Sequence, residues 1–269
     1  MKRNTDLDFI RAILIVLMIL IHIVSFGNAY PQLKAGILSF MMPTFLIITG
    51  YLVNIEKTGR QMGNYLKCLA LPYVIMVTGF SVLSYYMPVR DGITELSLSQ
   101  IGEKIFITSI GPYWFIQTMI ICGTLYYFCF SGRNWNDLRR NYTKRDTYAS
   151  LFVFAVTLLL ISETPALSAS AAAYYFIGVV IRQSKTEWNK LFRHEFFAII
   201  LWIYLLNHDD WYDWGSLAIV FSCWCCISTL LLLQHLLDAP ERFKDISPKI
   251  GKVAKVTNRI KDTLLYIGR

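Results

Sequence analysis

The stretch LDFIRAILIVLMILIHIVSF, residues 7–26, is apolar enough to span a membrane, yet it carries three ionisable side chains. About 20 apolar helical residues cross the hydrocarbon core of a bilayer. Asp8 and Arg11 lie near one end of this stretch, and His22 lies deep inside it. An ionisable side chain within a span is costly, so it usually faces the bundle interior or a water-filled cavity. The stretch therefore predicts both a span and a candidate functional site.

The composition extends the membrane prediction to the whole chain. Its 269 residues are 55% hydrophobic and 16% charged, and the mean hydropathy is +0.45. Apolar runs predict eight spans, near residues 9–27, 35–53, 66–87, 113–130, 147–162, 165–181, 195–207 and 214–237. We expect an all-α, polytopic transmembrane helical bundle that forms a single domain over residues 1–269. The first segment is too long and too charged for a cleaved signal peptide.

The Lys and Arg residues predict the orientation of the bundle. With a cytoplasmic N-terminus, only Lys34, Arg90 and Lys104 of the 26 Lys and Arg residues fall on the outer side. This asymmetry is a strong positive-inside signal. The net charge of +8 is therefore explained by topology and gives no reason to expect nucleic acid as a partner.

The six cysteines all lie in or beside apolar segments, and three of them form the cluster CWCC at residues 223–226. A structural metal site needs four ligands, and no histidine or carboxylate lies within ligand spacing of this cluster. We therefore expect the cysteines to pack as small apolar side chains, without a metal.

Arg11 and His22 fall on one face of the first predicted helix. Eleven residues at 100° each exceed three full turns by about 20°, and they separate the two side chains by roughly 16 Å along the axis. Asp8 lies three residues before Arg11, where the two side chains can pair. The same stripe contains Asp8, Ile15, Met18 and Ser25.

This layout suits a reaction between a phosphate-bearing donor and a hydroxyl. Arginine binds phosphate in a bidentate manner, and histidine removes protons near neutral pH. Acyl-coenzyme A combines a phosphate-rich head with a long arm that would carry its thioester from Arg11 towards His22. Two simpler interpretations stay open: Arg11 extends to lipid headgroups, and His22 is a neutral histidine bonded to another helix.

At this point the motifs support a family resemblance. LDFIRAILIVLMILIH resembles the first helix of the acyltransferase-3 family of membrane O-acyltransferases, in which Arg or Lys, ten further residues and His form the signature. Asp8 matches the acidic residue that often precedes the Arg. Three later segments resemble family motifs in the same order: PTFLIITGYLV (43–53), with Thr49 for the usual Ser, GPYWFIQTMI (111–120) and YYFIGVVI (174–181).

The sequence departs from the family pattern at two places. The Arg-rich inner loop after the second helix is reduced to Arg60 and Lys67. The family usually has about ten spans, and LLYIGR near the end of the chain is similar to the opening of a further span. We therefore expect the domain to be incomplete at its C-terminal end.

The resemblance implies transfer of an acyl group, most often acetyl, from cytoplasmic acyl-CoA to an envelope polysaccharide or a lipid-linked glycan. Acyl-CoA would be a donor substrate, with no permanently bound cofactor, and the location would be the bacterial inner membrane. His22 is the predicted catalytic base, although a covalent acyl-histidine also remains open. The predicted donor-binding residues are Arg11, Asp8, Arg60 and Lys67, and the predicted substrate-cavity residues are Thr49, Gly50, Trp114 and Phe115.

Other interpretations compete with this one. Thr49 and Gly50 can serve close helix packing, and Trp114 can belong to an interfacial aromatic belt. A transporter of an envelope intermediate would use His22 as a proton relay, but we find no paired broken helices of the kind that mark transporter sites. A truncated, non-catalytic remnant is a third interpretation.

Overall fold

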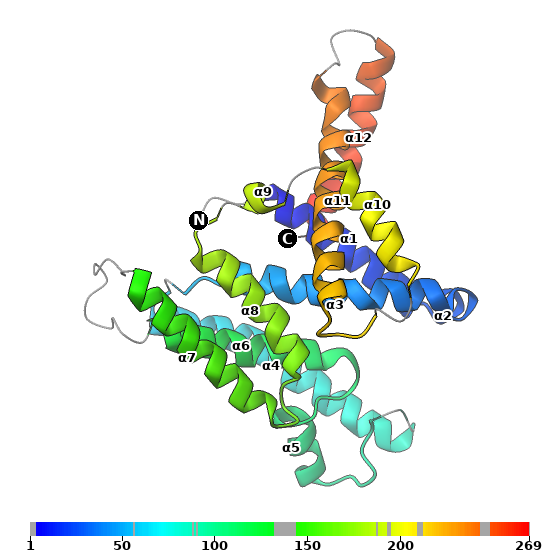
Figure 1. The fold of residues 1–269 in the computed structure, drawn as a ribbon. Helices are drawn as coiled ribbons and strands as arrows, with labels where there is room; N and C mark the ends of the chain where they lie inside the picture. The colour runs from blue at the N-terminus through cyan, green and yellow to red at the C-terminus, as the bar shows by residue number, and fades with distance from the viewer. Residues whose placement is uncertain are drawn as a thin grey trace. The chain divides into compact units, whose positions relative to one another are not determined.

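The computed structural model describes residues 4–268, except for 56, 88, 90, 132–143, 187, 193–194, 209–211 and 243–247. Arg90, one of the three predicted outer cations, lies outside the described residues. All regular elements in the described part of the chain are helices (Figure 1), which confirms the all-α prediction. The chain divides into two compact units, residues 1–48 with 184–269, and residues 49–183.

Each of the eight predicted spans coincides with helix. In order, these helices are α1 (Thr5–His22) with α2 (Val24–Ala29), α3 (Pro31–Leu52), α4 (Gly59–Tyr86), η1 (Gly111–Tyr113) with α6 (Trp114–Ser131), α7 (Lys144–Ser162), α8 (Ala169–Gln183), α10 (Phe196–Leu206) and α11 (Leu217–Arg242). The remaining helices are α5 (Leu98–Phe106), α9 (Trp188–Leu191) and α12 (Pro248–Ile267).

Five of the predicted spans are long and apolar enough to cross a membrane, judged over the described residues. They are Pro31–Leu52, Gly59–Tyr86, Gly111–Phe130, Arg145–Ser162 and Leu217–Pro240. The other three predicted spans do not meet these criteria of length and composition. Helix α1 carries the charged residues Asp6, Asp8 and Arg11, whereas α8 has only 15 residues and α10 only 11. The polytopic architecture is thus confirmed, with five spans supported by length and composition instead of eight.

The first predicted span, 9–27, is not one helix. Helix α1 ends at His22, and Ile23 adopts an extended conformation with φ −71° and ψ 110°. The amide of Ile23 donates to the carbonyl of Leu20 at 3.2 Å, and α2 then begins at Val24. Ser25 therefore belongs to a separate helix, and its predicted place on the Arg11–His22 stripe was wrong.

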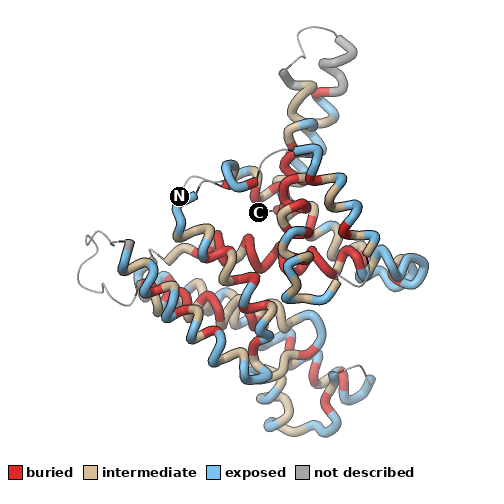
Figure 2. Tube along the Cα trace, in the orientation of Figure 1, coloured by how far each residue is buried: buried red, intermediate tan, exposed pale blue. Residues whose placement is uncertain are grey.

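The first unit is organised around α1, α3, α10 and α11, and its buried residues follow these helices in Figure 2. The thiol of Cys223 donates to the carbonyl of Phe40 at 3.7 Å, which joins α11 to α3. The indole of Trp202 on α10 donates to the hydroxyl of Ser222 at 3.1 Å. Cys223, Cys225 and Cys226 are all fully buried, as expected for cysteines that pack as apolar side chains.

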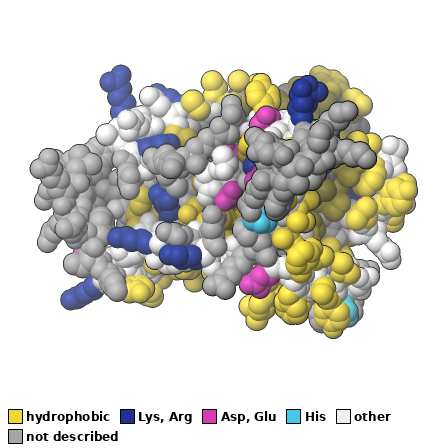
Figure 3. All heavy atoms as spheres, turned by 90° about the horizontal axis from the view of Figure 1, so that it is seen from above, with side chains coloured by type: hydrophobic (Ala, Val, Ile, Leu, Met, Phe, Trp, Pro, Cys, Tyr) yellow, Lys and Arg dark blue, Asp and Glu magenta, His cyan; other side chains and the backbone are white. Residues whose placement is uncertain are grey.

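The C-terminal segment forms α12, an amphipathic helix that packs along α11 and α1. The ammonium of Lys261 lies 2.6 Å from a carboxylate oxygen of Asp238 on α11. Described Lys and Arg side chains stand on the surface that Figure 3 draws. The cytoplasmic orientation of the basic segments stays a prediction.

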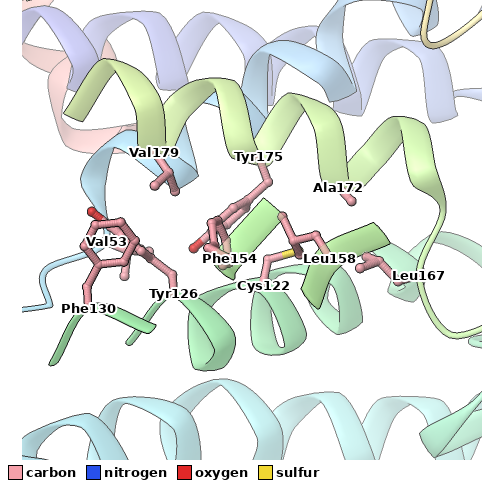
Figure 4. Close-up of a cluster of buried hydrophobic side chains, with 10 residues drawn as sticks. All are labelled: Val53, Cys122, Tyr126, Phe130, Phe154, Leu158, Leu167, Ala172, Tyr175 and Val179. Carbon is pink, nitrogen blue, oxygen red and sulfur yellow. The ribbon is translucent and has the colours of Figure 1, made fainter. Parts of the chain in front are cut away.

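The second unit has a core of aromatic and aliphatic side chains from α6, α7 and α8 (Figure 4). Tyr126, Phe154 and Tyr175 are fully buried at its centre. Gly50, near the end of α3, packs directly against the backbone of α8. A Cβ atom at this position would overlap the carbonyl oxygen of Tyr175 and lie 3.2 Å from the amide nitrogen of Val179. A glycine is therefore required for α3 and α8 to approach this closely.

We expect Gly50→Ala to destabilise the protein, because helix backbone, which cannot rotate away as a side chain can, occupies the space of the new methyl group. Overpacking of this kind costs about 1–3 kcal/mol. Gly63→Ala is the matched control, since it also adds a Cβ within a helix but meets nothing within 4 Å. The control should change stability by no more than about 1 kcal/mol, in the stabilising direction. Thermal unfolding in detergent measures both variants, and equal midpoints would contradict the packing role of Gly50.

Candidate functional site

Helix α1 begins with a well-formed cap that fixes its first turn. The side chain of Asn4 accepts hydrogen bonds from the amides of Asp6 and Leu7 at 3.0 and 3.4 Å. Asparagine is a preferred N-cap residue because its side chain pairs with amides that have no helical partner. Asp6 and Asp8 lie in this first turn, where the helix dipole favours negative charge.

The predicted polar stripe lies at the edge of the buried face of α1. Asp8, Arg11, Ile15 and Met18 are half-buried, and His22 is exposed. The neighbouring buried face packs into the unit through Leu7, Ile10, Leu14 and Ile21. Because α1 is continuous from Asp8 to His22, the stripe residues other than Ser25 share one helix, but none of them is fully buried.

His22 is held by a hydrogen bond within α1. Its Nδ1 atom lies 2.7 Å from the carbonyl oxygen of Met18, one turn earlier. A carbonyl oxygen only accepts hydrogen bonds, so Nδ1 must carry the proton. In the neutral ring the unprotonated nitrogen is then Nε2. An exposed imidazole with an oriented Nδ1 and a basic Nε2 has the arrangement that a general base requires.

Six of the predicted site residues belong to the second unit. The hydroxyl of Thr49 lies 3.9 Å from the sulfur of Met119 on α6, and Gly50 packs against α8 as described above. Trp114 and Phe115 are half-buried at the start of α6, and their rings meet edge to face at 6.1 Å. The contacts of Gly50 show a packing role, and the cavity role of these four residues stays a prediction.

Arg60 and Lys67 lie on the first part of α4, and both are exposed. The helix begins with a capping box, in which Thr58 and Gln61 each bond the backbone of the other. Seven residues along a helix return to nearly the same face, so Arg60 and Lys67 lie on one side of α4. Their contact with a donor stays a prediction, as does the pairing of Asp8 with Arg11.

The structure adds interactions of α1 that sequence reasoning missed. The side-chain amide of Gln234 on α11 donates to a carboxylate oxygen of Asp6 at 3.1 Å. The backbone of Gly268, just after α12, packs directly against the carbonyl of Asp8. The cap at Asn4 is recognisable from sequence, since Asn precedes an apolar helix. Gln234 carries no such signal, because its partner is 228 positions away along the chain.

The described residues bring no three His, Cys, Asp or Glu side chains together as metal ligands. What the site offers is an oriented imidazole and a guanidinium on one helix. Together with the apolar helices, it defines a multi-pass membrane protein with ionisable chemistry on its first helix.

Comparison with protein families matches residues 4–254 to the acyltransferase-3 family, described as an acyltransferase domain. The match covers nearly the whole chain and contains each of the predicted site residues. The chain therefore belongs to this family of membrane acyltransferases. Comparisons with curated proteins and with solved structures gave no match.

The hydrogen bond at His22 predicts its tautomer. We expect the neutral ring to carry its proton on Nδ1, whereas free histidine favours Nε2. Selective ¹⁵N labelling of histidine and NMR of the purified protein, with assignment by the loss of one signal in His22→Gln, distinguishes the two nitrogens. His208 provides an internal comparison, because its Nδ1 lies 2.9 Å from the carbonyl of Tyr204 in the same arrangement. A proton on Nε2 of His22 would contradict the assignment.

Proposed function

We propose that this protein is an O-acyltransferase of the bacterial inner membrane. It moves an acyl group, with acetyl favoured, from cytoplasmic acyl-CoA to a hydroxyl of a cell-envelope polysaccharide or lipid-linked glycan. Family membership supports acyl transfer in general, and the sequence resemblance supports the donor and the acceptor class. The observation that carries the proposal is His22, an exposed imidazole whose Nδ1 is bonded to the carbonyl of Met18, which leaves Nε2 as the nitrogen that would act on a substrate.

In the proposed reaction, Nε2 of His22 takes the proton of the acceptor hydroxyl. The oxygen attacks the thioester carbonyl carbon and forms the new C–O bond. The tetrahedral intermediate collapses with cleavage of the C–S bond, and the sulfur receives the proton from His22. The products are an ester and free coenzyme A, and His22 returns to its neutral form. The hydrogen bond to Met18 stabilises the imidazolium, because Nδ1–H keeps its acceptor throughout.

Arg11 would bind the phosphates of the donor. It lies roughly 16 Å from His22 along α1, at 1.5 Å per residue. The half-buried position of Arg11 reduces screening by water, which strengthens a charge-assisted hydrogen bond to phosphate. Asp8 would orient the guanidinium from one turn earlier on the same helix.

We expect His22→Ala to abolish transfer while the protein still inserts into the membrane. The assay measures ester-linked acetate released by mild alkali from the surface glycans of cells that carry each gene version. The matched control is His208→Ala, which removes another histidine with a similar bond, to Tyr204 in the last turn of the preceding helix, but lies outside the family signature. Ester present in the control and absent in His22→Ala supports the base.

Equal ester in wild-type and His22→Ala cells would make His22 a packing residue and overturn the mechanism. If neither makes ester, the assay is repeated with other acyl-CoA donors. Substrate flux without CoA release would favour the transporter instead.

We expect Arg11→Gln to raise the KM for acyl-CoA by about 10–100-fold, because a hydrogen bond to a charged group contributes about 1.5–3 kcal/mol. Arg11→Lys should recover only part of this loss, since lysine keeps the charge without the bidentate geometry. CoA release by inverted membrane vesicles, titrated with acyl-CoA, gives the KM. Lys255→Gln is the control, because it neutralises an exposed cation of the same unit. An unchanged KM in Arg11→Gln excludes Arg11 as the donor anchor.

A further inference from the structure

Helix α5 (Leu98–Phe106) connects two spans, and its side chains fall into three sectors. Ile101 and Ile105, four residues apart, form the first sector, and Ile105 packs against Tyr73 and Ile110. Gln100, Glu103 and Lys104 form a polar sector. A third sector, formed by Leu98, Gly102 and Phe106 at four-residue intervals, faces away from the unit: Leu98 is 89% exposed and Phe106 is 75% exposed. A helix between protein and water needs only two sectors.

Hydrogen bonds from neighbouring elements hold α5 in this orientation. The hydroxyl of buried Tyr73 on α4 donates to the carbonyl of Ile105 at 2.8 Å. The buried side-chain amide of Gln117 on α6 donates to the carbonyls of Phe106 and Ile107 at 3.3 Å each. The hydroxyl of Ser97 caps the other end by accepting from the amide of Gln100 at 3.2 Å. The exposed apolar sector is therefore fixed by the fold.

Large apolar side chains are also exposed beside α5 and along α4. Leu96 and Ile107, which flank α5, are also 51% and 44% exposed. Along α4, the large exposed apolar side chains are Leu71, Val74, Ile75, Met76, Phe80 and Leu83. Because α4 is long and apolar enough to span the membrane, this surface of α4 is where lipid is expected.

Aromatic side chains indicate the depth of α5 in the bilayer. Tyr85 and Tyr86 are exposed at the end of α4, immediately before the segment that leads to α5. Tyr113 and Trp114 lie at the start of the next span, and Phe80 meets Tyr113 edge to face at 5.6 Å. Tyr and Trp concentrate where hydrocarbon meets headgroups. In Figure 1, α5 runs across the direction of α4, as an interfacial helix does, and its last turn is bonded to Gln117, in the first turn of α6.

We propose that α5 lies in the outer membrane–water interface, with Leu98 and Phe106 inserted among phospholipid acyl chains and Glu103 in water. Burial of a large apolar side chain contributes about 1.5–3 kcal/mol, so two such residues held in water by the fold are unfavourable. Lipid removes both from water and extends the lipid-facing surface of α4. This inference concerns the membrane contact and is independent of the chemistry proposed for His22.

Spin labels at Leu98→Cys, Phe106→Cys and Glu103→Cys test the proposal in liposomes. The background is Cys68→Ser with Cys129→Ala, because the other four cysteines are buried. Accessibility to oxygen, which concentrates in lipid, is compared with accessibility to a water-soluble nickel chelate. We expect labels at 98 and 106 to collide mainly with oxygen and the label at 103 mainly with nickel. In intact cells, a membrane-impermeant maleimide should react with Glu103→Cys and thereby identify the outer side.

Three results overturn the proposal. Strong nickel collisions at all three positions would place α5 in water. Weak collisions with both reagents at 98 and 106 would show that a second copy or another protein covers them. Failure of Glu103→Cys to react in intact cells, with reaction after the cells are opened, would overturn the outer location.

Discussion

A backbone amide or carbonyl without a hydrogen-bond partner is costly in a bilayer. This constraint determines both the helical form of the spans and the hydrogen bonds at the ends of the helices. It requires helices for the spans, and it requires side chains to satisfy carbonyls wherever a helix ends. At Ile23 the break after α1 is accommodated by a bond from its amide to Leu20. His22 lies immediately before that break and bonds to Met18. The imidazole of His22, the proposed catalytic base, is thus oriented by the last turn of its own helix.

The same constraint explains the connection between α4 and α6 in the second unit. The last carbonyls of α5 have no helical partner, and Gln117 and Tyr73 supply donors to them from two spans. Gln117 belongs to the segment GPYWFIQTMI, which resembles a family motif and is rich in aromatic residues. The structure gives this segment a further task, since its glutamine orders the helix that precedes the span. The first turn of α6 therefore carries both the aromatic residues of this segment and the glutamine that bonds to the end of α5.

Much of the architecture was predictable, because span length and apolar composition are strong local signals. The positions of α3, α4, α6, α7 and α11 follow from them directly. The break at Ile23 was not predictable, since the surrounding sequence contains neither glycine nor proline at that point and its β-branched residues only weakly disfavour helix.

The side-chain contacts were harder to predict than the spans. The family signature in α1 was visible because it lies within 12 consecutive residues. The contact of Gly50 with Tyr175 and the bond of Gln234 to Asp6 join residues that are distant in sequence. No local sequence pattern indicates such contacts. The last residues of the chain are a related case. LLYIG, residues 264–268, resembles the opening of a further span, and in the structure it forms the end of α12, an amphipathic helix that packs along α11 and α1. The incompleteness of the domain stays a prediction.

The continuity of α1 carries a consequence for the proposed donor. A straight helix between Arg11 and His22 keeps the two side chains at a separation of roughly 16 Å along the axis. A small acyl donor, such as an acyl phosphate, cannot contact both groups at once. A coenzyme A thioester can, because a long flexible arm separates its phosphates from its reacting carbonyl. In the proposed roles, the continuous helix selects the donor by length, and binding energy gained at Arg11 serves to position the thioester near His22.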